Sequence, residues 1–152
     1  MSSTRVTRRV KARRADVYAA LVDPDSVARW KAPAGMTCHV HTFEPREGGT
    51  LRISLTYDAP TEAGKTSART DTYRGRFVEL VPNERVVEID EFETTDPALR
   101  GEMTITIILA DADGGTEVTG LHEGLPPGVS IADNQAGWES ALARLAALVE
   151  AG

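Results

Sequence analysis

Residues 130–152, SIADNQAGWESALARLAALVEAG, predict a long amphipathic helix. Large apolar side chains recur at helical spacing along one face, which Ala141 and Leu148 widen: Trp138, Leu142, Leu145 and Val149. Ser130 precedes Asp133 by three positions, which resembles a capping box with aspartate in place of Glu or Gln. Each large side chain of this stripe contributes roughly 1.5–3 kcal/mol when it is fully buried. The helix must therefore pack against the rest of the protein.

Strand-like segments fill most of the chain before this helix. They are rich in β-branched and aromatic residues, and several alternate with a period of two. They are TCHVHTF (37–43), TLRISLTY (50–57), TDTYRGRFVELV (70–81), RVVEIDEF (85–92), EMTITIILA (102–110) and TEVTGLHE (116–123), and TRVTRRV (4–10) predicts a further edge strand. The sequence DADGG (111–115) predicts a tight hairpin, because glycine accepts the positive φ that such turns demand.

The order of these segments predicts the fold class. Two short helices, 15–23 and 25–30, follow the first strand, and the polar connection 58–69 predicts a mobile loop. We therefore predict a single α+β domain over residues 1–152, with an antiparallel sheet of six to seven strands wrapped around the C-terminal helix. A twisted sheet curls, so a straight helix touches it unevenly and a cavity is expected at one end.

Composition excludes several classes of function. The formal net charge is −6 and no sustained basic stripe exists, which argues against nucleic-acid binding. No segment has the length of a membrane span or the apolar block of a secretory signal, so we expect a cytoplasmic protein with no membrane partner. Cys38 is the single cysteine, which excludes an internal disulfide. No nucleophile, phosphate-loop or dinucleotide motif occurs, which favours binding over catalysis and predicts no cofactor.

Five motifs together resemble the SRPBCC (START-like) superfamily, in particular its branch of homologues of the Hsp90 ATPase activator. They are VYAALVDPDSVARW (17–30), PREGGTLRISLTY (45–57), YRGRFVELVPNERVVE (73–88), GGTEVTGLHEGLP (114–126) and NQAGWESALARL (134–145). The resemblance covers nearly the whole chain in the right order. It implies a helix-grip fold, in which the sheet wraps the last helix and encloses a pocket that opens at one end.

The resemblance leaves three functions open. The first is the binding of an apolar or amphipathic small molecule between the sheet and the last helix. The second is an enzyme of the polyketide cyclase or aromatase kind, which needs only a shaped pocket and one or two acid–base groups. The third is an interaction module that acts on a heat-shock ATPase; in the eukaryotic co-chaperone a separate N-terminal domain engages the chaperone, and we expect none here. A homodimer is one of the expected states.

The segment RVVEIDEF (85–92) holds the main acid–base candidates. Val86, Glu88, Asp90 and Phe92 share one face of the strand, and the resemblance implies that this face points toward the pocket. Desolvation there would raise the pKa values of the two carboxyls, as a general acid requires. The alternative is an edge strand whose carboxylates face water, because a shift of one residue in register reverses the faces.

His122 is the third catalytic candidate, because it stands at the end of the last strand beside Glu123. The alternative is a structural histidine whose hydrogen bonds are satisfied. His39 and His41 alternate on one strand face, but no third ligand is evident, so we predict no metal site. The predicted ligand-binding residues are mainly large aromatic and polar side chains: Trp30, Tyr57, Tyr73, Phe77, Glu88, Asp90, His122, Trp138 and Leu142.

Overall fold

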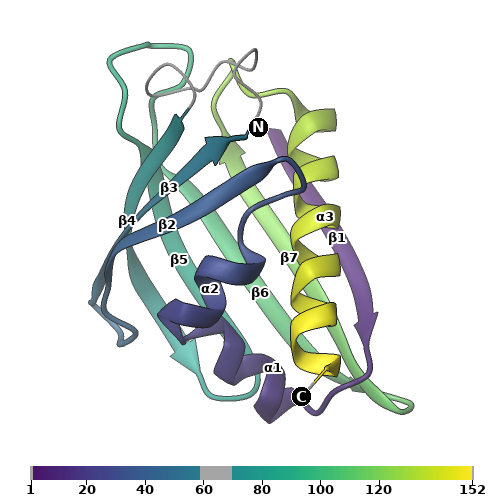
Figure 1. Cartoon of the computed structure of the whole chain (residues 1–152). Helices are drawn as coiled ribbons and strands as arrows, with labels where there is room; N and C mark the ends of the chain where they lie inside the picture. Colours follow the sequence, from purple (N-terminus) through teal and green to yellow (C-terminus); the bar gives the residue numbers. More distant parts are fainter. Residues whose placement is uncertain (1, 59–69, 152) are drawn as a thin grey trace.

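A computed structural model describes residues 2–58 and 70–151 of the chain (Figure 1). Its strands are β1 (Ser2–Val10), β2 (Met36–Phe43), β3 (Thr50–Tyr57), β4 (Thr70–Val81), β5 (Arg85–Phe92), β6 (Met103–Ala112) and β7 (Gly115–Leu125). Its helices are α1 (Arg14–Leu21), α2 (Pro24–Trp30) and α3 (Ile131–Glu150). The predicted α+β class is therefore confirmed, and most predicted bounds agree within two residues. The expected mobile loop over 58–69 lies, except for Asp58, outside the described residues.

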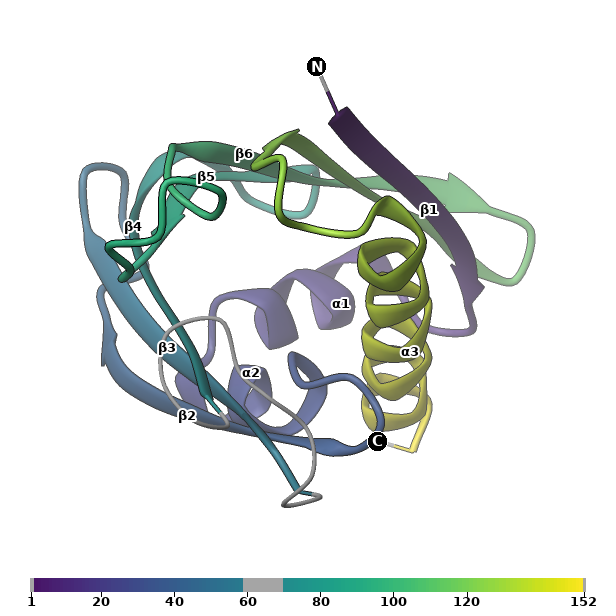
Figure 2. The same ribbon diagram turned by 90° about the horizontal axis from the view of Figure 1, so that it is seen from above.

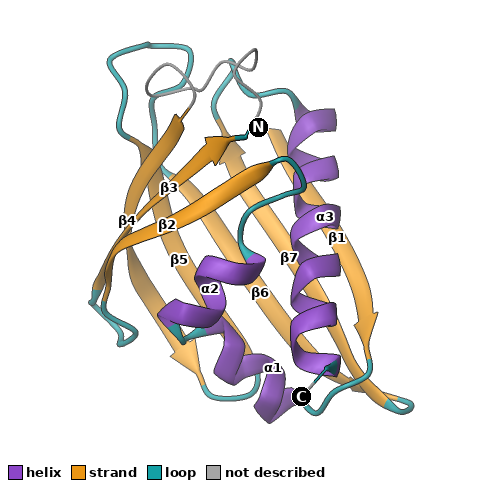
Figure 3. Cartoon of the chain, in the orientation of Figure 1, coloured by secondary structure: helices purple, strands orange, loops and turns teal. Residues whose placement is uncertain are grey.

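The seven strands form one antiparallel sheet in the order β1-β7-β6-β5-β4-β3-β2. Strands β2 to β7 follow one another as a meander, and β1 joins it at the far edge by pairing with β7 (Figure 3). The predicted hairpin connects β6 to β7, with Gly114 at φ 75°. Seen from above, the sheet curls around α3, and α1 and α2 lie across the remaining opening (Figure 2).

Helix α3 begins where the sequence predicts, because the Ser130 hydroxyl accepts a hydrogen bond from the Asp133 backbone N–H at 3.2 Å. The predicted apolar face is buried, including Trp138, Leu142 and Leu145. The helix packs mainly against β1 and α2, with smaller contacts to α1 and β7. Its axis therefore follows one edge of the curled sheet, and the middle strands face the interior at a distance from it.

Helices α1 and α2 fill the other end of the curl. Asp23 caps α2 by accepting a hydrogen bond from the Ser26 backbone N–H at 3.0 Å, and Pro24 occupies the first turn, where its missing N–H costs nothing. The apolar side of α2 buries Val27 and Trp30 in the core. The Trp30 indole N–H donates to the Ala20 carbonyl oxygen at 3.0 Å, which ties α2 to α1.

Strand β5 lies between β4 and β6 in the middle of the sheet, so the edge-strand alternative is wrong. Val86, Glu88 and Asp90 are buried, whereas the side chains between them are only half-buried. The interior face is therefore the one that the family resemblance implied. Within the described part of the chain, no helix combines the length and the apolarity that crossing a membrane requires.

The burial of α3 generates a prediction about stability. Leu145 is fully buried in the core, whereas Leu148 on the same helix is half-buried. We expect Leu145→Ala to lower the free energy of unfolding by about 2–5 kcal/mol, because it removes core contacts and leaves a cavity. Leu148→Ala serves as the matched control and should cost clearly less. Urea denaturation measures both, and equal losses would contradict the packing described for α3.

Candidate functional site

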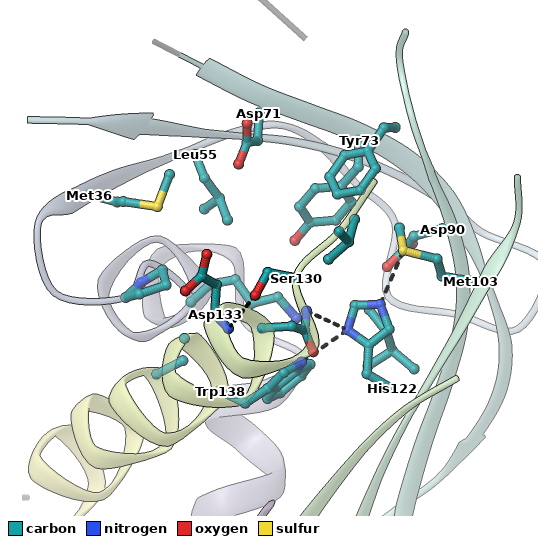
Figure 4. Close-up of a pocket in the computed structure, with 18 of the residues that line it drawn as sticks. Met36, Leu55, Asp71, Tyr73, Asp90, Met103, His122, Ser130, Asp133 and Trp138 are labelled. Carbon is teal, nitrogen blue, oxygen red and sulfur yellow. Dashed lines mark hydrogen bonds between the residues drawn. The ribbon is translucent and has the colours of Figure 1, made fainter. Parts of the chain in front are cut away.

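A pocket with a volume of about 290 Å³ lies between the first turns of α3 and the interior face of the sheet (Figure 4). Its walls come from every strand of the meander, β2 to β7, as well as from α3. The apolar and aromatic part of the lining comprises Pro33, Met36, Leu55, Tyr57, Tyr73, Phe92, Met103, Ile105, Val129, Trp138 and Ala141. The polar part comprises Lys31, Asp71, Asp90, His122, Ser130, Asp133 and Asn134.

Burial distinguishes the rim of this pocket from its inner end. Gly128, Ser130 and Asp133 are exposed, so the rim lies at the N-terminus of α3 and the loop that precedes it. Tyr73 and Asp90, in contrast, are buried and mark the inner end. The pocket therefore opens beside the N-terminal end of α3 and extends inward to β4 and β5.

His122 is held in a network that joins β7 to α3. The Trp138 indole N–H donates to His122 Nδ1 at 3.0 Å, and the Asn134 side-chain amide lies 3.4 Å from the same nitrogen. An indole can only donate, so Nδ1 carries no proton and the imidazole proton is on Nε2, which lies 3.1 Å from Met103 Sδ. Burial and the nearby Lys31 ammonium lower the pKa of His122 to about 4, so the ring is neutral at pH 7.

Asn134 extends this network to the first strand. Its side-chain oxygen accepts a hydrogen bond from the Thr4 hydroxyl at 2.6 Å, which leaves its amide N–H free to donate toward His122. Gly120 on β7 faces the Trp138 ring so closely that an added Cβ would lie 3.1 Å from it. These contacts fix the start of α3 against β1 and β7.

Three charged or titratable side chains, those of Lys31, Glu88 and Asp90, lie close together at the inner end of the pocket. Lys31 Nζ lies 3.9 Å from Glu88 Oε1, and both side chains are about nine-tenths buried. The same ammonium lies 5.2 Å from the Trp30 ring centroid and 5.0 Å from that of Trp138, within the range of cation–π attraction. At 3.9 Å the ion pair is an electrostatic contact rather than a hydrogen bond.

Asp90 stands beside this ion pair and is only 1% exposed. Neither of its oxygens has a hydrogen-bond donor among the described residues. Desolvation raises the pKa of Asp90 well above its ordinary value, and the nearby negative charge of Glu88 and a hydrogen bond with it add to this effect. Two carboxylates only accept, so the Asp90–Glu88 hydrogen bond exists when a proton lies between them. Burial beside Glu88 therefore favours the uncharged form of Asp90 more than exposure to water would.

Gly75 on β4 provides the room for this carboxyl. It lies directly opposite Asp90 in the β4–β5 register, and a Cβ at position 75 would overlap Asp90 Oδ1 and the Ile89 carbonyl oxygen. Tyr73, two residues earlier on the same face, has a fully buried hydroxyl without a hydrogen-bond partner in the part of the chain that the structure describes. Desolvation, followed by the charges of Glu88 and Asp90, raises the pKa of Tyr73 well above its ordinary value, so its O–H is retained.

The structure brings five of the predicted ligand-binding residues together in the pocket lining: Tyr57, Tyr73, Asp90, His122 and Trp138. Trp30, Phe77 and Leu142 instead lie in the hydrophobic core, outside the lining. Glu88 is buried behind the lining, where it pairs with Lys31. Of the three catalytic candidates, Asp90 and His122 thus face the cavity, and their roles stay predictions.

Two lining residues with clear roles were missing from the sequence prediction. Asn134 precedes Trp138 by four positions, a spacing that places both on one helix face, so helical periodicity offered a signal for it. Lys31 offered no such signal, because a lysine after a helix ordinarily faces water.

The His39 and His41 rings contact each other edge to face, with 4.5 Å between their centroids. No group of three or more His, Cys, Asp or Glu side chains in residues 2–58 and 70–151 is arranged to hold a metal ion.

The chain resembles solved structures over its whole length. Protein CV1439 from Chromobacterium violaceum is 34% identical, with a TM-score of 0.87 and coverage of 97% of this chain and 96% of that one. A Rhodobacter sphaeroides protein is 23% identical, with a TM-score of 0.80 and coverage of 99% and 93%. DynU16, from the dynemicin biosynthetic locus, shares the fold at 22% identity and a TM-score of 0.70, with coverage of 99% and 48%.

No curated protein sequence matches the chain. The family model described as Activator of Hsp90 ATPase homolog 1-like protein matches residues 11–150, which is most of the sequence. This match agrees with the curled sheet, the closing helix and the five sequence motifs described above. The chain belongs to the family of Activator of Hsp90 ATPase homolog 1-like proteins.

Proposed function

We propose that the protein binds an apolar or amphipathic small molecule in the cavity between the sheet and the start of α3. The observation that carries this proposal is the cavity itself, whose volume of about 290 Å³ is close to the lower end of the range of about 300–1,000 Å³ for ligand sites. Its lining is mostly apolar and aromatic with a few polar groups, which is the composition of small-molecule sites.

A second candidate function is acid–base catalysis of the polyketide cyclase or aromatase kind. The observation that favours it is Asp90, a buried carboxyl on the cavity wall whose pKa desolvation raises well above its ordinary value. Such a group can donate a proton to an oxygen of a bound substrate. His122 fits this role less well, because its Nδ1 lone pair already accepts a hydrogen bond from Trp138. Activation of a heat-shock ATPase stays a prediction, which stimulation of ATP hydrolysis by the chaperone would test.

The binding proposal predicts that the pocket binds an apolar dye, and that a substitution which fills the pocket weakens this binding. The neutral dye N-phenyl-1-naphthylamine should bind with a saturable rise in fluorescence. Leu55→Trp places a large ring in the pocket and should weaken this binding about tenfold or more, equivalent to about 1.4 kcal/mol.

Val78→Trp is the matched control, because Val78 is 46% exposed and lies outside the pocket lining. This variant should bind the dye as the unmodified chain does. Saturable dye binding that survives unchanged in Leu55→Trp would place the bound dye elsewhere, and an absence of binding to the unmodified chain would contradict the proposed function.

The protonated state of Asp90 predicts a pH dependence of stability. Below the pKa of an unfolded aspartate, near 4, the group is protonated in both states. As the pH rises further, the unfolded chain releases this proton at a lower pH than the folded chain, because burial raises the pKa of Asp90 in the folded state, so the group's contribution to stability falls. Asp90→Asn removes this titration, and its stability relative to the unmodified chain should therefore increase between pH 4 and pH 8.

Urea denaturation at the two pH values measures this difference. Asp113→Asn, in the exposed turn between β6 and β7, is the control for the loss of a surface charge. A stability difference for Asp90→Asn that is the same at pH 4 and pH 8 would show that Asp90 ionises normally in the folded protein, and it would remove the support for the acid–base candidate.

A further inference from the structure

We propose that the inner end of the cavity binds the neutral hydroxyl group of a ring-bearing ligand, with Tyr73 and Asp90 as its hydrogen-bond partners. This inference rests on the proposed binding function and names the chemical class of ligand that the site selects. It starts from two residues of the cavity wall: Tyr73, whose buried hydroxyl has no partner in the described part of the chain, and Asp90, whose buried oxygens receive no hydrogen bond from a donor there.

Tyr73 supplies a hydrogen-bond donor. Its hydroxyl is buried, points into the cavity in Figure 4, and has no partner among residues 2–58 and 70–151. An unpaired buried hydroxyl destabilises the folded state, because it has lost its hydrogen bonds to water. A ligand atom that accepts from this O–H would recover that loss.

Asp90 supplies the complementary acceptor. The proton that it holds is engaged with Glu88, and Glu88 in turn pairs with Lys31. This arrangement leaves the other Asp90 oxygen available as an acceptor, and Asp90 is part of the cavity lining. A hydroxyl group donates once and accepts readily, so it satisfies Asp90 and Tyr73 together. A ketone could accept from Tyr73 but would leave the Asp90 oxygen unpaired.

The sheet register places the two groups within reach of one ligand atom. Tyr73 lies opposite Phe92, and Asp90 is two residues away from Phe92 on the same face, so Tyr73 and Asp90 are diagonal neighbours. Gly75, which lies opposite Asp90, carries no side chain that would separate them. A substituent held between two adjacent strands can therefore contact both groups.

The charges around the site favour a neutral ligand. The Lys31 ammonium and the Glu88 carboxylate compensate each other, and His122 is neutral at pH 7. A ligand carboxylate would stand beside Asp90 and Glu88, and a ligand ammonium would stand beside Lys31. At the inner end, where Lys31 is already paired with Glu88, either charge would lose its hydration without a free counter-ion, which costs more than the burial of a hydrogen-bonded hydroxyl.

Aromatic side chains select the rest of the ligand. Tyr57, Phe92 and Trp138 line the same cavity as Tyr73, and flat rings pack against such side chains with favourable edge and face contacts. The walls around them are aliphatic or thioether groups from residues such as Ile105 and Met103. A flat ring system with one hydroxyl therefore matches both the walls and the inner end.

A matched series of naphthalene derivatives tests this inference by displacement of N-phenyl-1-naphthylamine from the full chain. We expect 2-naphthol to compete about tenfold better than naphthalene, because it satisfies two buried groups. The anion 2-naphthoate and the cation 2-naphthylmethylammonium should both compete less well than 2-naphthol. Equal competition by naphthol and naphthalene, or the strongest competition by either ion, would overturn the inference while leaving the proposed function intact.

Three variants test which residues cause the preference for 2-naphthol over naphthalene. Tyr73→Phe and Asp90→Leu should each reduce the advantage of 2-naphthol over naphthalene several-fold. Asp90→Asn should retain the advantage, because its amide donates to Glu88 and its oxygen still accepts from the ligand. The affinities of each variant for naphthalene and for the dye show whether its pocket is intact. A hydroxyl preference that persists unchanged in both Tyr73→Phe and Asp90→Leu would contradict the assignment of these partners.

Discussion

The structure depends on the way α3 is fixed against one edge of a curled sheet. Trp138 lies over Gly120 and donates to His122, Asn134 bonds to Thr4, and these contacts tie the start of the helix to β1 and β7. A rigid helix held at that edge cannot also touch β4 and β5, which curve away from it (Figure 2). The interior side chains of the middle strands therefore line a space beside the helix, and this space is the cavity.

The polar inner end follows from the same constraint. Central strands of a sheet ordinarily present apolar side chains to the interior, yet β5 presents Glu88 and Asp90 there. Lys31 reaches Glu88 from the end of α2, and the two tryptophan rings surround its ammonium. Burial raises the pKa of Asp90 beside this pair, at a site that Gly75 keeps open. The fold thus keeps polar atoms against a mainly apolar cavity, where a ligand can use them.

Sequence alone predicted the elements because their signals are local. The stripe from Trp138 to Val149, the Ser130 cap and the glycine turn before β7 each depend on nearby residues. The sequence left open whether the Glu88 and Asp90 face of β5 points to the interior or to water, because the strands that pair with β5 determine its orientation. Lys31 and Tyr73 show why the site was only partly predictable. The role of Lys31 arises from its contacts with β5 and α3, and the unpaired hydroxyl of Tyr73 arises because no other described residue reaches it.

The most direct test is a high-resolution crystal structure of the protein purified from its own cells. We expect an open cavity with ordered density, from a ligand or from water, within hydrogen-bond distance of both the Tyr73 hydroxyl and the Asp90 oxygen that does not face Glu88. A cavity filled by rearranged side chains, in which other groups of the protein bond to the Tyr73 hydroxyl and to the Asp90 oxygen that does not face Glu88, would contradict it.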